Sequence, residues 1–248
     1  MTGPITAVPL PLPRVTGSGL THRGRRRERN EDAILTDPTG RVWAVADGMG
    51  GYGHGDVAAD IVIDHLETLP DGALVPAALA ARIEAAHSGI LAHARRRGIL
   101  RMGATVVALA VERGTAHVAW VGDSRAYLLR EGRLRPLTRD HSVVQALIDS
   151  GALSVAQVGS HPDAHVVTRA VGVGDAVEVD TVSTRLVAGD RLLLCSDGLT
   201  SCVDEPAIED HLRAAPSPDD ACLALVRAAL DAGAPDNVSV IVVEIGGA

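Results

Sequence analysis

Four aspartates lie beside short apolar segments typical of buried β-strands, although they are far apart in the sequence. Asp47, Asp197 and Asp236 belong to RVWAVADGMGG, RLLLCSDGLT and APDNVSVIVV, and Asp123 ends HVAWVGDS. A strand next to a carboxylate carries that group to the rim of a packed scaffold. Carboxylates gathered at one rim would repel one another unless cations lay between them, and Mg²⁺ and Mn²⁺ prefer oxygen ligands. The pattern therefore favours a fold that builds a multi-metal site, and such sites are typical of phosphoryl chemistry.

The remaining pattern predicts runs of adjacent strands interrupted by pairs of helices. Strands are expected at 33–36, 41–46, 104–111, 116–121, 126–130, 134–137, 177–184, 191–195 and 238–244, and helices at 56–69, 76–97, 141–149, 205–214 and 218–232. This order differs from the strict alternation of βαβ units. It predicts an α+β fold, an antiparallel β-sandwich flanked by helices on both faces, in a single domain (α-β-β-α layers). Residues 1–13 are Pro-rich and are expected to form a flexible tail.

The composition narrows the possible environment of the chain. A hydrophobic content of 46% is enough for a large core, which Leu, Val, Ile and Ala must fill because Phe is absent. The net charge of -8 argues against general nucleic-acid binding. Three cysteines without zinc-like spacing fit buried thiols in a reducing compartment. We find no membrane-spanning run and no signal peptide, and we expect a cytoplasmic protein.

Residues 48–53 match the dinucleotide-binding pattern G-x-G-x-x-G between a predicted strand and a predicted helix. Three observations argue against that interpretation. Asp47 would place a carboxylate beside the pyrophosphate, residues 66–72 contain a helix end where a second strand is needed, and the repeating parallel units are missing.

Residues 21–32, THRGRRRERNED, combine five arginines with an acidic end. A solvated basic patch or a nucleic-acid arm is the simplest interpretation. However, the arginines run directly into Asn30-Glu31-Asp32 and a predicted strand. Since the guanidinium fork matches phosphate oxygens, this arrangement suits a site that binds metal and phosphate together.

Six short motifs occur in the order and rough spacing of the PPM family. They are R-x-x-N-E-D (27–32), D-G-M-G-G (47–51), M-G-A-T (102–105), G-D-S-R (122–125), C-S-D-G-L (195–199) and P-D-N-V (235–238). Residues 14–245 thus resemble the protein phosphatase 2C-like, metal-dependent serine/threonine phosphatases in their compact bacterial form. The resemblance implies that residues 14–248 form one catalytic domain with a metal centre at one end of a β-sandwich.

The resemblance also implies the ligands of that centre. Asp47 would bridge two core ions, Mn²⁺ or Mg²⁺, and the Gly48 carbonyl would bind one of them. Asp197 and Asp236 would hold the other ion. Asp123 resembles the ligand of a third, weaker ion that it would share with Asp197. A hydroxide bridging the two core ions would then attack the phosphorus atom directly.

Further positions match residues around the metals. Arg27 matches the arginine that binds the substrate phosphate. Glu31 matches an acidic position that acts through water, and Asp32 and Asn237 are expected to support the ligands from behind.

The proton donor for the leaving group is left open. Some family members carry a histidine where this chain has Met49. The candidates here are His54, His141, His161 and His165, although for each a structural histidine is the simpler interpretation, and metal-bound water could serve instead. Cys195 lies in an apolar strand without a C-x₅-R loop, which predicts a buried cysteine rather than a nucleophile.

The implied substrate is a phosphoprotein, and the implied activity opposes a serine/threonine kinase. Residues 152–176 have weak periodicity and are expected to form a partly irregular flap that affects specificity. A monomer is expected. Two alternatives stay open: a catalytically silent relative that acts as a binding module, and a phosphatase of a small phosphate ester.

Overall fold

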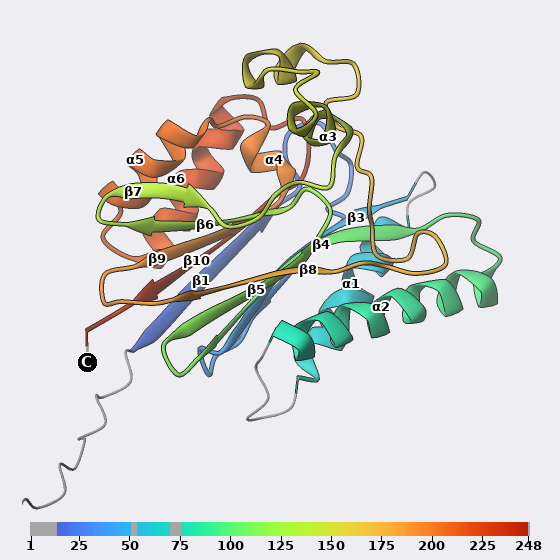
Figure 1. Cartoon of the computed structure of the whole chain (residues 1–248), viewed down its shortest axis with the longest axis horizontal. Coiled ribbons are helices and arrows are strands. Elements are labelled where there is room, and N and C mark those ends of the chain that lie inside the picture. The colour runs from blue at the N-terminus through green and yellow to red at the C-terminus, as the bar shows by residue number, and fades with distance from the viewer. Residues whose placement is uncertain (1–13, 51–53, 70–75, 248) are drawn as a thin grey trace, which may run out of the picture.

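Two antiparallel five-stranded sheets form the centre of the protein (Figure 1). The computed structural model describes residues 14–50, 54–69 and 76–247. Across the first sheet, the neighbouring strands are in turn β1 (Val15–His22), β10 (Val238–Ile245), β9 (Arg191–Cys195), β6 (Arg125–Arg130) and β7 (Arg133–Pro136). The second sheet contains β2 (Asp32–Thr36), β3 (Val42–Met49), β4 (Gly103–Glu112), β5 (Thr115–Val121) and β8 (Asp180–Arg185).

Helices cover the outer face of each sheet (Figure 1). The first sheet carries α5 (Glu205–Ala214) and α6 (Pro218–Asp231), and the second carries α1 (Gly55–Glu67) and α2 (Pro76–Arg97). The segment over one end contains α3 (Val143–Asp149) and the 3₁₀ helix η1 (Val155–Ser160). The predicted α-β-β-α sandwich in a single domain is therefore confirmed. The prediction of a flexible tail at 1–13 lies outside the described residues.

Strand alternation explains the layers. In β3, Ala44 and Ala46 pack toward α1 and α2, whereas Trp43 and Val45 pack between the sheets. Neighbouring β4 alternates in the same way, because successive side chains of a strand point to opposite faces. The face under the helices is rich in alanine, so the helices approach the sheet closely. The larger side chains fill the space between the sheets.

Glycines in β1 allow the two sheets to meet closely. A Cβ at Gly17 would lie 2.6 Å from Nε1 of Trp43, and one at Gly19 would lie 2.8 Å from Cγ2 of Thr36. Both glycines share the face of β1 that carries Val15 toward the core between the sheets. The absence of a side chain there sets how closely β1 and β2 approach.

Most predicted elements form, with local differences. The strand expected at 177–184 is confined to β8, Asp180–Arg185, and the helix expected at 141–149 begins at Val143, because the Ser142 side chain caps it by accepting from the Gln145 N–H. The four-residue helix α4 (Asp197–Thr200) and η1 were not predicted. Their apolar periods are too short to identify from a pattern.

Among the described residues, no helix combines the length and the apolar character needed to cross a bilayer.

Replacing Gly19 with Val should destabilise the protein by about 1–3 kcal/mol, because its side chain overlaps Thr36 across the sheet interface. Thr16→Val is the control: it also introduces a valine into β1, but at an exposed position on the other face of the strand, where the side chain it replaces is already branched. Its effect should stay within about 0.5 kcal/mol. Urea unfolding of both variants measures the difference, and equal effects would contradict the role of the glycine.

Candidate active site

The aspartates singled out in the sequence meet at one end of the sandwich. Asp32 pairs with Asp47 across β2 and β3, and Asp236 lies just before β10. Asp123 occupies the turn between β5 and β6, and Asp197 follows β9. Two details differ from the expectation of strand-ending carboxylates. Asp47 lies inside β3, two residues before its end, and Asp197 is the first residue of α4.

A cavity of about 660 Å³ opens between these residues. Of the nine predicted site residues, eight line it: Arg27, Glu31, Asp47, Gly48, Asp123, Asp197, Asp236 and Asn237. The exception is Asp32, which lies behind the cavity wall. The antiparallel topology produces this convergence, because the ends of β3, β5 and β9 and the starts of β2 and β10 lie at the same end of the two sheets.

Burial and mutual repulsion make these carboxyl groups hard to ionise. Burial raises the pKa of Asp47 well above its usual range, and the charges of Asp32, Asp197 and Asp123 raise it further. Burial and then the charge of Asp197 raise the pKa of Asp123 to about 7. The pKa of Asp197 is also raised, by burial and then by Asp236. Protons or cations must therefore neutralise this end of the molecule.

Two buried carboxylate oxygens lack a hydrogen-bond partner within the described part of the chain, Oδ1 of Asp32 and Oδ1 of Asp197. The other oxygen of Asp32 accepts from the hydroxyls of Ser239 at 2.6 Å and Ser196 at 3.0 Å. Burial nevertheless raises the pKa of Asp32 to about 6. Since buried acceptors are rarely left unpaired, the free oxygen of Asp197 at the cavity is an observation that fits a bound cation.

Asn237 holds the arginine-rich segment against the sandwich. Its Nδ2 donates to the carbonyls of Arg23 and Arg29, both at 2.9 Å, and its Oδ1 accepts from the Glu31 N–H at 2.9 Å. The side chain is buried, so these bonds are shielded from water. The same segment presents Arg27, whose NH2 donates to Oδ2 of Asp236 at 2.6 Å.

Glycines at the floor of the cavity allow backbone segments to approach one another. A Cβ at Gly48 would lie 2.1 Å from the carbonyl oxygen of Gly55 and 2.5 Å from that of Glu31. The Gly48 N–H donates to the Glu31 carbonyl. Burial and then the charge of Asp56 raise the pKa of Glu31. The Gly48 backbone therefore lines the cavity without a side chain to cover it.

Two contacts fix the turn that carries Asp123. Gly122 has φ of 107°, and a Cβ there would lie 2.5 Å from Cβ of Thr105. Nδ1 of His141 accepts from the Gly122 N–H at 3.1 Å, and the His141 N–H donates to the Gly122 carbonyl at 2.9 Å. The His141 ring also stacks on Trp120, with centroids 6.1 Å apart.

The four candidate histidines occupy different environments. His141 is buried, and burial lowers its pKa, so it is a neutral structural residue. His54 precedes α1, and Nδ1 of His161 accepts from the Asp163 N–H. Among the described residues, His165 is the histidine that lines the cavity.

The cysteines lie away from the cavity. Cys195 and Cys222 are buried and Cys202 is half-buried, and all three are free thiols. Burial raises the pKa of Cys195 to about 12, so its thiolate is not formed near neutral pH.

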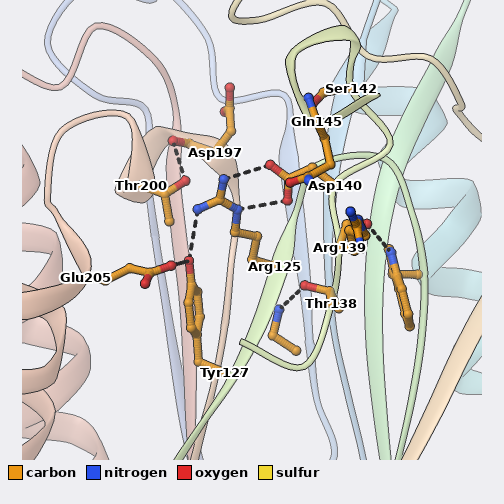
Figure 2. A network of polar contacts seen from close by, with 12 residues as sticks. Arg125, Tyr127, Thr138, Arg139, Asp140, Ser142, Gln145, Asp197, Thr200 and Glu205 are labelled. Carbon is orange, nitrogen blue, oxygen red and sulfur yellow. Dashed lines mark hydrogen bonds and ion pairs between the residues drawn. The ribbon is translucent and has the colours of Figure 1, made fainter. Parts of the chain in front are cut away.

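A polar network joins β6 to the segment that leads to α3 (Figure 2). Arg125 binds Asp140 through two parallel hydrogen bonds of 2.8 and 2.7 Å, and its NH1 donates to the Tyr127 hydroxyl at 3.0 Å. That hydroxyl donates to Glu205 of α5 at 3.3 Å. No local pattern in the sequence predicts this network, although Arg125 belongs to the G-D-S-R motif.

Other residues at the cavity were not assigned a role from the sequence. They are Arg26, Met49, Gly50, Thr105, Val167, Ser201 and Pro235. Thr105 and Pro235 lie within motifs, which was an available signal, and the Thr105 hydroxyl contacts that of Ser124 at 2.7 Å. Ser201 and Val167 carry no local pattern that would reveal them.

The donors suit hard cations, since they are carboxylates beside the backbone of Gly48. No three His, Cys, Asp or Glu side chains of the described residues are arranged to hold an ion by themselves. At Asp236, the reason is that the carboxylate is paired with Arg27 instead. A bound ion would have to draw Asp236 from Arg27 and complete its shell with carbonyl and water oxygens.

The layered sandwich with a carboxylate-lined cavity at one end places the protein in the fold class of solved serine/threonine phosphatases. The catalytic domain of a serine/threonine protein phosphatase PstP, solved in complex with two manganese ions, superposes with a TM-score of 0.86 at 35% identity. The match covers 94% of this chain and 99% of that one.

Sequence comparison gives the same class. Residues 19–222 match the model of the protein phosphatase 2C family. PstP of Mycobacterium tuberculosis is 37% identical over 227 residues, which are 90% of this chain and 43% of PstP, so this chain spans less than half of that relative. The serine/threonine phosphatase Stp of Listeria welshimeri is 36% identical over 90% of this chain and 93% of its own. The chain belongs to the protein phosphatase 2C family.

Metal-stripped protein should become less stable as the pH rises from about 5 to about 8. The pKa values of Asp32 and Asp123 are raised to about 6 and about 7 in the folded protein, from 3.8. The folded state therefore binds more protons than the unfolded state, and this stabilisation is lost as the pH passes through the raised values. A loss of ~2 kcal/mol corresponds to roughly 4–8 °C in Tm.

Thermal melting with and without Mn²⁺ tests this expectation. The stabilisation by Mn²⁺ should grow with pH, because protons and cations compete for the same oxygens. Asp123→Asn removes one repelling charge and should flatten the pH dependence of the metal-stripped protein. Identical curves for both proteins would contradict the repulsion.

Asp140→Asn should destabilise the protein by about 2 kcal/mol, because it leaves the half-buried Arg125 without its anionic partner. The control is Asp149→Asn, which breaks the exposed pair with Arg139 and should have little measurable effect. Chemical denaturation of both variants compares them. A larger loss for Asp149→Asn would refute the structural role of the Arg125 network.

Proposed function

We propose that this protein is a metal-dependent phosphatase that hydrolyses phosphoserine and phosphothreonine in proteins. The observation that carries the proposal is the set of buried, mutually repelling carboxylates around a cavity that also presents Arg27. Carboxylates call for cations, and an arginine beside them calls for an anion. A phosphate monoester bound to metal ions satisfies both requirements.

The proposed core site uses three aspartates and one carbonyl. Asp47 and the Gly48 carbonyl would hold one ion, and Asp47, Asp197 and Asp236 would hold the other. When bound, the ions would activate a water molecule as the nucleophile and neutralise charge on the phosphate. We propose Mn²⁺ or Mg²⁺, and the two manganese ions of the PstP structure support the count.

Other residues would extend or support this site. Asp123 would hold a third, weaker ion together with Asp197, and Glu31 would act through water. Asp32 would hold β2 against the other sheet through its bonds to Ser196, which follows β9, and Ser239 of β10. Asn237 would position the arginine segment through its three backbone bonds.

Arg27 is proposed to bind the substrate phosphate. Its side chain is 56% exposed at the cavity, and its bond to Asp236 uses one of five N–H donors. When Asp236 turns to a metal, the guanidinium fork becomes available for two phosphate oxygens. Arg26 lines the same cavity and adds positive charge.

His165 and metal-bound water remain the two candidates for the proton donor to the leaving group. Cys195 is excluded as the nucleophile, since it is a buried thiol with a strongly raised pKa.

The biological setting is part of the proposal. Residues 14–248 would form the catalytic domain of a monomeric, cytoplasmic phosphatase that opposes a serine/threonine kinase. The net charge of -8 supports protein rather than nucleic-acid substrates. A silent binding module would be expected to lack some of the ligand positions, and all of them are present. A small phosphate ester stays the second candidate substrate, because the carboxylates and Arg27 recognise phosphate alone.

Metal-stripped protein should not release phosphate from a phosphothreonine peptide, and adding Mn²⁺ should restore hydrolysis. Asp197→Ala should abolish the restored activity, by about 10³-fold or more, because a ligand of the metal site is lost. Cys195→Ala is the matched control from the end of the preceding strand and should retain activity. The measurement is the rate of phosphate release by the unsubstituted protein, Asp197→Ala and Cys195→Ala.

Folded protein that releases no phosphate at any Mn²⁺ or Mg²⁺ concentration would contradict the phosphatase proposal and favour the silent module. Hydrolysis of p-nitrophenyl phosphate without hydrolysis of any phosphopeptide would favour the small ester.

A further inference from the structure

A second cavity, of about 670 Å³, adjoins the carboxylate-lined one. One wall is the C-terminal half of α2, with Leu91 and Ala94, and the other is formed by residues 172–174. Its floor is the paired ends of β3 and β4, where Met49 lies opposite Gly103. Figure 1 shows the end of α2, the start of β4 and the segment before β8 together at this end of the molecule.

The two cavities are neighbours that share part of their lining. Met49 and Gly50 line both of them, so a chain bound with its phosphate at the carboxylates would pass close to the second cavity, which we call the α2 groove. Met49, at the end of β3, follows Asp47 and Gly48 directly. Any residue that enters the groove would therefore be close in sequence to the phosphorylated residue of a substrate.

The α2 groove is apolar and partly open. Among the described residues that line it, Arg101 is the only one that is neither apolar nor glycine. Leu100 is 93% exposed and Val173 is 54% exposed, so both are available to a ligand. Met49 and Met102 are the methionines of the chain besides Met1, and both line this groove. Flexible methionines suit surfaces that accept varied aliphatic side chains.

The 172–174 wall is preformed. The Gly172 N–H donates to Nδ1 of the buried His87 at 3.0 Å, and Val171 pairs with Ala104 through two backbone hydrogen bonds. A Cβ at Gly172 would lie 2.3 Å from Cγ2 of Ile90, so the segment rests directly on α2. A ligand therefore meets a wall that is already in place, which lowers the entropic cost of binding.

The surroundings of the α2 groove are basic in an otherwise acidic protein. Arg101 lines the groove, and Arg95, Arg96 and Arg97 are exposed in the last turn of α2. Asp175, which follows Gly174 of the opposite wall, is the acidic residue nearest in sequence to the residues of the groove. The local charge thus favours an acidic ligand, although the whole chain carries a net charge of -8.

We propose that the α2 groove binds the substrate polypeptide on one side of its phosphorylated residue, and that it selects an aliphatic side chain followed by acidic residues. This inference rests on the proposed phosphatase function, because the occupant is identified from the position of the groove beside the cavity that would bind the phosphate. It names the class of phosphoprotein that the enzyme prefers.

The test compares hydrolysis of phosphothreonine peptides by the full chain with Mn²⁺. Each peptide has an alanine background and one leucine at a defined position before or after the phosphothreonine. Two glutamates follow on the side of the leucine that is farther from the phosphothreonine. A leucine at one or two positions on a single side should raise kcat/KM about tenfold over the all-alanine peptide, mainly through KM. p-Nitrophenyl phosphate, which is too small to reach the groove, measures the metal site alone.

Leu100→Glu combined with Val173→Glu should remove the preference for leucine and leave hydrolysis of p-nitrophenyl phosphate unchanged. Arg101→Glu should remove the benefit of the glutamates. The control is Leu223→Glu, another exposed leucine that lies on α6 at the other face of the sandwich. All three groove substitutions change exposed residues. The rate with p-nitrophenyl phosphate verifies that each variant is folded.

Equal kcat/KM for all peptides, or a leucine preference that survives the groove variants, would overturn the inference while leaving the phosphatase function intact. If wild-type protein fails to hydrolyse p-nitrophenyl phosphate and every phosphopeptide, the proposed function itself fails. The two results are distinguishable.

Discussion

Repulsion among buried carboxylates is the constraint on which the rest of this structure depends. Asp47, Asp123 and Asp197 come from separate strands and turns, yet they are held together where their charges disfavour one another. Such a cluster is stable only when the scaffold around it is rigid and cations or protons balance the charge. The two sheets supply the rigidity, because each of these aspartates lies in or near a strand that is anchored in the apolar core.

The supporting residues explain how the repulsion is tolerated at one end of the molecule. Ser196 and Ser239 give hydrogen bonds to Asp32, and Asn237 fixes the segment that brings arginine to the cavity. None of these three would be singled out for chemistry by their residue types alone. Their role is visible only when the strands are placed side by side. The division between acidic cavity and apolar groove also follows from the strands, since β3 ends between the two with Met49.

The sequence predicted the layered fold and most of the candidate site, because both depend on local patterns. Alternation marks strands such as β4, and motifs around Asp47 and Asp236 carry their own context. It could not predict that Asp197 begins a helix, since a four-residue helix has no period of its own. It also missed the pairing of Arg125 with Asp140 and the bond of His141 to Gly122, although a structural role was the simpler interpretation of His141. Those contacts join residues 15 to 19 positions apart, and no local pattern encodes them.

Asp123 is enclosed by two attachments to one short stretch of chain. His141 binds the residue before it, and Asp140 binds Arg125, two residues after it. The stretch that leads into α3 therefore cannot shift without disturbing the turn, and the turn cannot shift without disturbing that stretch. If Asp123 holds an ion as proposed, thermodynamic reciprocity would apply. Whatever favours one position of the outer segment would change the affinity of that ion, and binding of the ion would change the balance of positions of the segment by the same factor.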